Sequence, residues 1–589
     1  MSKNILQCIG RFYQQSCRCL CKITPHFGHQ GSSLPECLRQ KNEVVEQEKS
    51  RLTEAEYFRR KYANMEELAK TLPAAQPVET DAVFVNKEVR LGELDVYGFD
   101  YDYTLVNYTN ALAEFIFQET IGLLVWKWKY PQELLSVKYD PNFLIRGLHY
   151  DIKTGFIMKV DAFKNIQSGT VYKGLRPVPY EVVQSNYNGL YIPSALLRGS
   201  VHTKVRLAHQ RPEFVQSNAD FSNLNQICLF QDHKITQMMD FFDLPASYAV
   251  CSAIENAVHT IHESGLLHRT IIKHPELYIK PNPLLRELLI HLASYGKSLF
   301  LISNSGASFI NEGMNYVVGR DWRKFFDVII VGANKPDFFR SNSSKRPCCF
   351  STLFNPAISD FRPFRAVDEN GAFLSWEGVS KFESGQLYLG GSLDLLKQLT
   401  KWQLQRVLYF GDHVYSDLAV SCGILFPSSF TIIFFKSWMH VQKGVLKFIW
   451  FVPHWHLDAS NQWGWATAAV IPELEKELTL INTSKYQDNL RRLILLEELL
   501  IENQYAVTAV GQSILASWRR ERDTLRQFSK SGFNPHFGSV FRSFHKYSYF
   551  AQRLGLYASM YTSSVTNLLH LPINHVCYPR RTLLPHEPR

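Results

Sequence analysis

The sequence lacks the long apolar run that a membrane-spanning helix needs, which is about 20 uninterrupted residues. Its most apolar region, residues 420–462, is interrupted by Pro427, Lys436 and Lys443. A secretory signal is also missing, because no apolar core of about 7 to 15 residues follows the first basic residues. These absences argue against an integral membrane protein and against secretion.

Metal-binding cysteine pairs and long basic runs are also absent. The 11 cysteines show no C-x-x-C pairs with zinc spacing, so we expect free thiols in a reducing, intracellular compartment. The net charge of +10 comes from 64 basic and 54 acidic residues spread along the chain. Such a modest excess favours small anionic ligands such as phosphate esters and does not argue for nucleic-acid binding.

The first 35 residues contain no Asp or Glu, but they include Lys3, Arg11, Arg18 and Lys22. Two interpretations of residues 1–40 stay open, a mitochondrial transit segment and a disordered leader. The protein is therefore expected to be cytoplasmic or mitochondrial. Residues 41–90 are expected to form a helical extension, with a charged and mainly solvated helix over 41–72.

The central motif is residues 96–105, VYGFDYDYTL, in which a short apolar run ends in two aspartates. In an extended segment alternate side chains point the same way, so Asp100 and Asp102 can both face a cleft where a parallel strand ends. Open α/β sheets bind ligands at such strand ends. Two carboxylates suit Mg²⁺, and a carboxylate can also attack phosphorus.

Three more apolar runs end in polar groups, in chain order. Residues 298–306 end in Ser303, Asn304 and Ser305, whose hydroxyl and amide groups can hold phosphate oxygens. Residues 326–336 place Lys335 after a strand, where a cation would offset phosphate charge. Residues 407–417 end in Gly-Asp, with Asp412 and Asp417 five residues apart. Together the four runs supply a nucleophile, a proton carrier, a phosphate clamp and metal ligands.

This order of motifs resembles the haloacid dehalogenase (HAD) superfamily of phosphohydrolases. Within this superfamily, four segments are similar in sequence to those of the 5′-nucleotidase domain-containing proteins, which are relatives of the cytosolic purine 5′-nucleotidase. These segments are residues 98–105, 146–151, 335–339 and 409–413. The resemblance runs from about residue 94 to residue 581. It implies a Mg²⁺-dependent hydrolase that acts on a small phosphomonoester, with a nucleoside 5′-monophosphate as the expected substrate.

The resemblance also implies roles for single residues. Asp100 would be the nucleophile and a Mg²⁺ ligand, and Asp102 the general acid/base that also offers its carbonyl to the metal. Ser303 would bind the phosphoryl group and Lys335 would stabilise phospho-Asp100. Asp412 and Asp417 would complete the metal site. Three alternatives stay open: a helix cap at Ser303, a surface cation at Lys335 and a helix start at Asp417.

The fold class expected from the resemblance is α/β, a doubly wound parallel sheet with a large α+β cap inserted between the first two motifs. About 200 residues separate Asp102 from Ser303, far more than one crossover helix needs. The expected cap contains a helix after Thr109, a strand over 155–162 and helices over 241–264 and 282–295.

The purine enzyme has a phosphate-binding lysine where this chain has His268, and His262 matches a histidine of its nucleotide pocket. Because His268 is neutral or partly charged near pH 7, we expect a weak or pH-dependent clamp.

We divide the chain into the leader and extension described above, a core, a cap, and a C-terminal extension. The core comprises residues 91–110 and 290–480, the cap 111–289 and the C-terminal extension 481–589. Two stretches of the core, 341–360 and 420–462, are atypical insertions. For the second we favour translated intron sequence over a metal site built from His440, His454 and His456.

In the C-terminal extension, helical spacing over 485–503 and 505–529 predicts a helical hairpin, which we expect to pack on the core. Self-association through this hairpin is the alternative. An aromatic and basic tail over 534–561 is expected to form an ordered flap on the core. The competing interpretation of the whole chain is a catalytically weak or inactive scaffold that keeps the fold.

Overall fold

The computed structural model describes residues 53–581, except 194–195, 198–232, 234, 240, 242–259, 262–263, 340–362 and 420–464. The leader, residues 41–52, both insertions (341–360 and 420–462) and most of the helix predicted over 241–264 lie outside the described residues. So does His262. No helix of the described part is long and apolar enough to cross a membrane.

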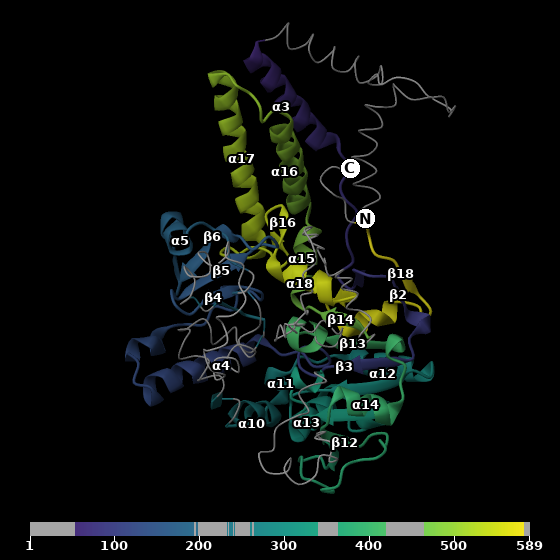
Figure 1. Cartoon of the computed structure of the whole chain (residues 1–589). Coiled ribbons are helices and arrows are strands. Elements are labelled where there is room, and N and C mark those ends of the chain that lie inside the picture. The colour runs from purple at the N-terminus through teal and green to yellow at the C-terminus, as the bar shows by residue number, and fades with distance from the viewer. Residues whose placement is uncertain are drawn as a thin grey trace, which may run out of the picture.

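A nine-stranded sheet forms the centre of the described chain (Figure 1), with strand order β1-β17-β14-β13-β3-β9-β10-β12-β11. The seven inner strands pair in parallel, and only the edge strands β1 and β11 run antiparallel to their neighbours. The mixed α/β class and the parallel sheet are confirmed. The strands are β1 (Phe84–Val85), β3 (Val96–Phe99), β9 (Ser298–Ile302), β10 (Val328–Val331), β11 (Phe364–Val367), β12 (Leu387–Gly390), β13 (Val407–Gly411), β14 (Ala466–Val470) and β17 (Met560–Thr562).

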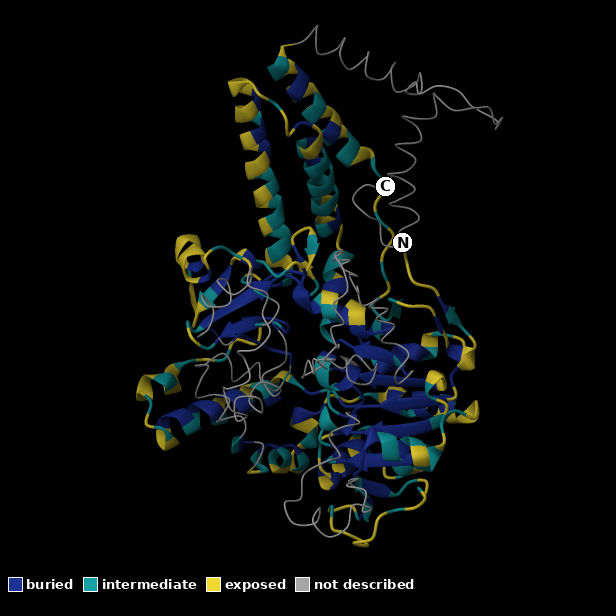
Figure 2. Cartoon of the chain, in the orientation of Figure 1, coloured by how far each residue is buried: buried dark blue, intermediate teal, exposed yellow. Residues whose placement is uncertain are grey.

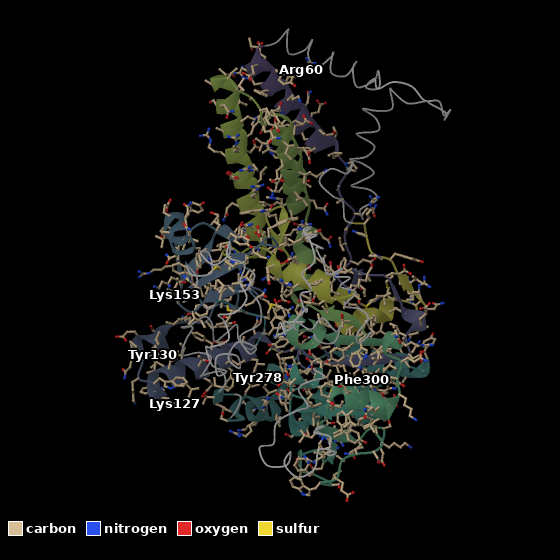
Figure 3. All side chains as sticks on the ribbon, in the orientation of Figure 1. Arg60, Lys127, Tyr130, Lys153, Tyr278 and Phe300 are labelled. Carbon is tan, nitrogen blue, oxygen red and sulfur yellow. The ribbon has the colours of Figure 1, made fainter. Side chains whose placement is uncertain are left out.

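Both faces of this sheet are buried (Figure 2), as the continuous apolar runs predict. One face packs on α12 (Pro283–Ser294) and α13 (Ala307–Val317), and the other on α14 (Leu393–Thr400). Phe300 of β9 lies in the main-sheet region (Figure 3) and pairs with Gly98 of β3; a Cβ at Gly98 would lie 2.0 Å from its ring. Glycine in the central motif therefore allows β3 and β9 to pair.

A second, five-stranded antiparallel sheet lies between Asp102 and Ser303 in the chain, with strand order β7-β6-β5-β4-β8. The predicted strand over 155–162 is its β5 (Phe156–Val160). Its other strands are β4 (His149–Asp151), β6 (Ile166–Lys173), β7 (Arg176–Pro177) and β8 (Ile235–Gln237). The helix predicted after Thr109 is α4 (Asn110–Gly122), and α5 (Tyr180–Tyr187) packs on this sheet. The helix predicted over 282–295 is α12, but it packs on the main sheet through Leu285, Leu288, Leu289 and Leu292.

The predicted hairpin exists as α16 (Ser484–Glu502) and α17 (Ala509–Phe533), but it contacts the core only in part, through residues 473–481, and packs mainly elsewhere. It forms a three-helix bundle with α3 (Glu54–Thr71), which projects from the rest of the molecule (Figure 1). Tyr57, Phe58 and Met65 of α3 are buried against Leu496, Leu499 and Trp518. Most of the helix at 54–71 is exposed or half-buried, as its charges predict, but one of its faces completes a separate apolar core.

The C-terminal tail is more than a flap. After α18 (Tyr549–Tyr557) it supplies β17, which lies between β1 and β14 in the main sheet. Its end forms β18 (Val576–Cys577), paired with β2 (Val89–Arg90). Residues at the two ends of the described chain therefore complete one edge of the fold together.

Candidate active site

The four predicted motif ends meet at one edge of the main sheet. Asp100, Ser303, Lys335 and Asp412 each follow the carboxyl end of a strand, and the strand order β13-β3-β9-β10 makes these strands neighbours. Parallel pairing brings their carboxyl ends to the same edge, where open α/β sheets bind ligands.

Three buried aspartates form an acidic cluster at this edge. One carboxylate oxygen each of Asp100, Asp412 and Asp417 lies within 4.8 Å of the other two. Gly411 packs closely against Asp417, because a Cβ at position 411 would lie only 2.5 Å from the Cβ of Asp417. A compact set of hard carboxylate oxygens fits Mg²⁺, so these residues have the chemistry of a magnesium site.

Lys335 lies inside this cluster rather than on the surface. Its ammonium Nζ is 2.6 Å from Oδ1 of Asp100 and 2.7 Å from Oδ1 of Asp417, and it donates to the Tyr409 hydroxyl at 3.4 Å. Burial disfavours the charged amine, but the carboxylates of Asp100 and Asp417 outweigh this and raise the pKa of Lys335 well above its usual range. These carboxylates therefore favour the charged form of Lys335 beside Asp100.

Burial raises the pKa of Asp100, and the Lys335 ammonium opposes this effect. The carboxylates of Asp417 and Asp102 raise the pKa further. A bound divalent cation would act in the same direction as Lys335, because positive charge favours the carboxylate. A bound cation would therefore stabilise the ionised form of the carboxylates in this cluster.

Asp102 lies next to the cluster and has two hydroxyl partners. Tyr108 donates to its Oδ1 at 2.5 Å, and Ser305 donates to its Oδ2 at 2.7 Å. Burial raises the pKa of Asp102, while these two hydrogen bonds lower it. A half-buried carboxyl with a raised pKa can hold a proton for transfer, which suits a general acid/base. The sequence analysis did not identify Tyr108. The one feature that related it to the motif was its position three residues after Leu105.

The loop after β9 supports the other loops. The hydroxyl of Ser303, which is buried, accepts from the Ser305 backbone N–H at 3.0 Å. The amide of Asn304 accepts from the Lys335 backbone N–H at 2.5 Å and donates to the Lys335 carbonyl at 3.2 Å. Asn304 thus fixes the loop that carries Lys335 through two hydrogen bonds, and Ser305 orients Asp102 through one. Ser303 is not the cap of α13, because that helix begins after Gly306.

Asp417 lies in a short helix over Val414–Ala419 and accepts from the His413 backbone N–H at 3.2 Å. His413 accepts at Nδ1 from the backbone N–H groups of Tyr415 and Ser416, at 3.2 and 3.1 Å. This histidine is structural because it caps the turn that carries Asp417.

His268 lies on α10 (Leu266–Lys273), with its ring 4.5 Å from the ring of Phe309. Burial lowers its pKa, and the Asp102 carboxylate raises it only in part. Burial therefore favours the neutral imidazole of His268, which would not supply the positive charge of a lysine.

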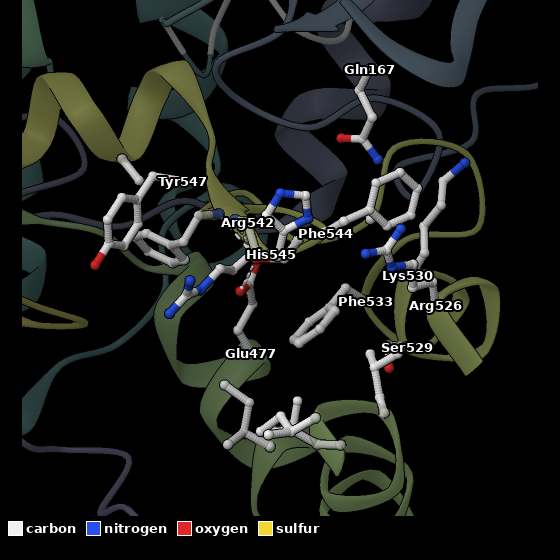
Figure 4. A pocket seen from close by; sticks show the side chains of 18 of the residues that line it. Gln167, Glu477, Arg526, Ser529, Lys530, Phe533, Arg542, Phe544, His545 and Tyr547 are labelled. Atoms are coloured by element: carbon white, nitrogen blue, oxygen red, sulfur yellow. Dashed lines mark hydrogen bonds between the residues drawn. The ribbon is translucent and has the colours of Figure 1, made fainter. Parts of the chain in front are cut away.

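A separate cavity of about 1320 Å³ lies beside α16, α17 and the tail (Figure 4). None of the predicted site residues lines it. Lys159 and Glu477 face it from β5 and from α15 (Glu473–Ile481). The Lys159 ammonium donates to the carbonyls of Phe537, Ser539 and Arg542, so this lysine holds the tail.

The fold and this site define an α/β protein that carries a buried cluster of carboxylates and a lysine at the carboxyl ends of parallel strands. The model of the 5′ nucleotidase family matches residues 83–352, 355–425 and 456–589. The chain belongs to this family, which confirms the resemblance found in the sequence and is consistent with the HAD superfamily. The matched ranges include 341–352 and leave out 426–455, part of the stretch expected to be an insertion.

Individual relatives agree with this assignment. The chain is 36% identical over 510 residues to the human 5′-nucleotidase domain-containing protein 2, covering 86% of this chain and 85% of the relative. The rat protein of the same name is 35% identical over 510 residues, or 86% and 80% of the two chains. A 5′-nucleotidase domain-containing protein of Dictyostelium discoideum is 33% identical over 512 residues, or 86% and 74%.

Proposed function

We propose that this protein is a Mg²⁺-dependent phosphomonoesterase that hydrolyses nucleoside 5′-monophosphates through an aspartyl-phosphate on Asp100. One observation carries the proposal: the buried contact of Lys335 with Asp100 and Asp417, beside Asp412 and Asp102, at the ends of adjacent strands. The family and the names of the relatives support the nucleotide as the substrate class.

In the first step the Asp100 carboxylate attacks phosphorus, and the bond from phosphorus to the leaving oxygen breaks. Asp102 gives its proton to that oxygen, so the nucleoside leaves as an alcohol. In the second step water attacks phosphorus, Asp102 takes a proton from the water, and inorganic phosphate leaves as Asp100 is restored. Lys335 offsets the negative charge on the phosphoryl group in both steps.

Asp100, Asp412 and Asp417, with the backbone carbonyl of Asp102, are the residues that would hold Mg²⁺. When bound, the cation supplies charge neutralisation at the phosphoryl oxygens. Ser303 and the backbone of its loop are the proposed phosphate contacts.

We further propose that the second sheet acts as a cap. The inserted region contacts the site loops at several places. Among these contacts, the Phe241 ring stacks on Tyr103 at 4.3 Å, and Gln237 accepts from the Tyr415 hydroxyl at 2.7 Å. A cap at this position would exclude water and contact the leaving group. His268 on α10 would face the same space as a neutral group.

The test is phosphate release by the purified protein, with and without Mg²⁺, from a panel of nucleoside 5′-monophosphates and one aryl phosphate. Asp100→Asn is expected to lower kcat by about 10³-fold or more, because the nucleophile is lost. Asp327→Asn is the matched control, since Asp327 lies at the opposite end of β10 and accepts from the Leu299 backbone. Its kcat should equal that of the wild type.

Acid quenching during turnover should trap phosphate on the wild-type protein in a hydroxylamine-sensitive form, and none on Asp100→Asn. If the folded wild type releases no more phosphate than Asp100→Asn, the hydrolase proposal fails. The scaffold interpretation would then replace it.

A further inference from the structure

The motif at residues 146–151, RGLHYD, has no part in the mechanism above. Its arginine lies just before β4 of the second sheet, yet its side chain is fully buried at the edge of the main sheet. Long cationic side chains are rarely buried without specific partners, so the partners of Arg146 are informative.

Arg146 contacts two acidic residues of the main-sheet region. It binds Glu473 with two hydrogen bonds, from Nε at 2.9 Å and from Nη2 at 2.8 Å. Its Nη1 donates to the backbone carbonyl of Asp412 at 2.9 Å and lies 3.6 Å from Oδ2 of the same residue. One planar guanidinium therefore joins the first turn of α15 to an aspartate of the acidic cluster.

Aromatic rings and a glycine fix the guanidinium in place. Its central carbon lies 4.2 Å from the ring centre of Phe241 and 5.3 Å from that of Phe550. Gly147 has φ of +87°, and a Cβ there would meet the Cβ of Phe550 at 2.7 Å. Only glycine next to Arg146 lets the backbone pass this close to α18, which accounts for the Arg-Gly pair of the motif.

We infer that Arg146 is a positioning residue that orients Asp412 for binding a divalent cation, an inference that rests on the proposed function. The carboxylates of Asp100, Asp412 and Asp417 repel one another, and the contact with Arg146 holds Asp412 in the cluster against this repulsion. The rigid fork of arginine reaches Glu473 and Asp412 at once, which the point charge of a lysine cannot do.

Glu473 has a distinct part in this arrangement. Its carboxylate balances the charge of the guanidinium, so Arg146 orients Asp412 without adding net positive charge beside the cation site. Because Arg146 precedes β4, the same contact fixes the second sheet to the metal site. Cation affinity should therefore depend on a residue that does not touch the cation.

The experiment measures Mn²⁺ binding to the purified full chain by electron paramagnetic resonance, which needs no turnover. Arg146→Lys is expected to weaken Mn²⁺ binding several-fold. The double variant R146M/E473Q removes both charges and leaves no unpaired buried ion, which favours folding. It should weaken binding by about 10-fold or more, as is typical when a partner of a metal ligand is lost.

The matched control is R286M/D321N. This pair is also held by two hydrogen bonds, at 2.7 and 2.9 Å, but it joins α12 to residues 319–325 and contacts none of the three aspartates. The control should bind Mn²⁺ as the wild type does. Circular dichroism and thermal unfolding of every variant separate loss of binding from loss of fold.

The outcomes distinguish the two proposals. If the wild type binds Mn²⁺ and folded Arg146→Lys or R146M/E473Q binds it equally well, the positioning role is overturned while the proposed function stands. If the wild type binds no Mn²⁺, or if Asp412→Asn binds it as tightly as the wild type does, the metal site fails and this inference fails with it. Weaker binding in both folded Arg146 variants, but not in the control, supports the inference.

Discussion

Asp102 depends on two neighbouring hydroxyl groups for its orientation, and Tyr108 makes the shorter hydrogen bond, at 2.5 Å. Tyr108→Phe removes this bond with little change in shape. We expect kcat/KM to fall about 10-fold for nucleoside 5′-monophosphates, a fraction of the 10² to 10⁴ that general acid/base catalysis supplies. The kcat/KM for 4-nitrophenyl phosphate should change little, because kcat/KM reports the first step and this leaving group needs no proton there.

The comparison of the two substrates separates a positioning effect from a general loss of structure. Tyr295→Phe, on an exposed residue at the end of α12, is the control and should leave both rates unchanged. An equal decrease for both substrates in Tyr108→Phe would contradict the role of Tyr108.

Among single residues, the sequence identified those that the structure brings together at the candidate site and missed the residues that contact them. Asp100 and Asp412 directly follow apolar runs, and Lys335 follows another after a short loop, so strand ends could be located without a structure. Tyr108 and Arg146 come from segments whose local patterns say nothing of the site. Their roles arise only from tertiary contacts, which a single sequence does not record.

Among the elements, the three-helix bundle has its own apolar core, centred on Trp518. The indole lies edge-on to Phe58, with centroids 5.6 Å apart, and stacks on Tyr62 at 5.9 Å. Trp518→Ala should destabilise the bundle by about 3 to 5 kcal/mol, the usual cost of removing a buried aromatic side chain. Hydrogen exchange should accelerate in α3, α16 and α17 and stay unchanged in β3, β9 and β13.

Val510→Ala is the control for this prediction, since Val510 is exposed on α17 and should have almost no effect. Faster exchange throughout the main sheet in Trp518→Ala would show that the bundle and the sheet unfold together.

The sequence predicted the hairpin from its leucine spacing, but not its partner. The buried face of α3 belongs to a helix whose many charges suggested a solvated surface.

The contact of α15 with the tail should be sensitive to pH. Glu477 accepts from the Ser539 hydroxyl at 2.7 Å and from the Val540 backbone N–H at 2.6 Å. Burial raises its pKa to about 7, against the lowering effects of these bonds and of Lys159, while Glu473 raises it further. The fold thus favours the protonated carboxyl, so its stabilising contribution is present below pH 4.5 and is lost as pH rises to about 7.

Glu477→Gln removes this titration. The free energy of unfolding of the wild type, minus that of the variant, should fall by about 3 kcal/mol between pH 4.5 and 7.5, since one pKa unit corresponds to about 1.4 kcal/mol. Urea unfolding at several pH values measures this difference. A difference that is constant with pH would contradict the raised pKa of Glu477.

For the whole molecule, the ends of the described chain close the main sheet. β17 fills the position between β1 and β14, and Met560, Val565 and Leu568 of this tail are buried in the main core. The aromatic and basic composition of the tail suggested a flap, because a three-residue strand leaves no clear alternation in a sequence. The position of β17 is fixed by pairing with a strand about 90 residues earlier, which local patterns cannot predict.

Truncation after Ala558 tests this closure. It removes β17 and β18, exposes the edge of β14 and takes three large apolar side chains out of the core. Each of them contributes about 1.5 to 3 kcal/mol when buried, so their combined loss is comparable to the total stability of a typical protein, about 5 to 15 kcal/mol. We expect aggregated protein on size-exclusion chromatography and no cooperative thermal transition.

Truncation after Arg581 is the control, because it keeps every element of the described chain. It should elute and unfold as the full-length protein does. A folded, monodisperse product of the shorter truncation would mean that β14 can serve as a sheet edge and that the tail is dispensable. Aggregation of that product alone would instead show that β17 is needed for a stable main sheet, the sheet whose edge carries the candidate site.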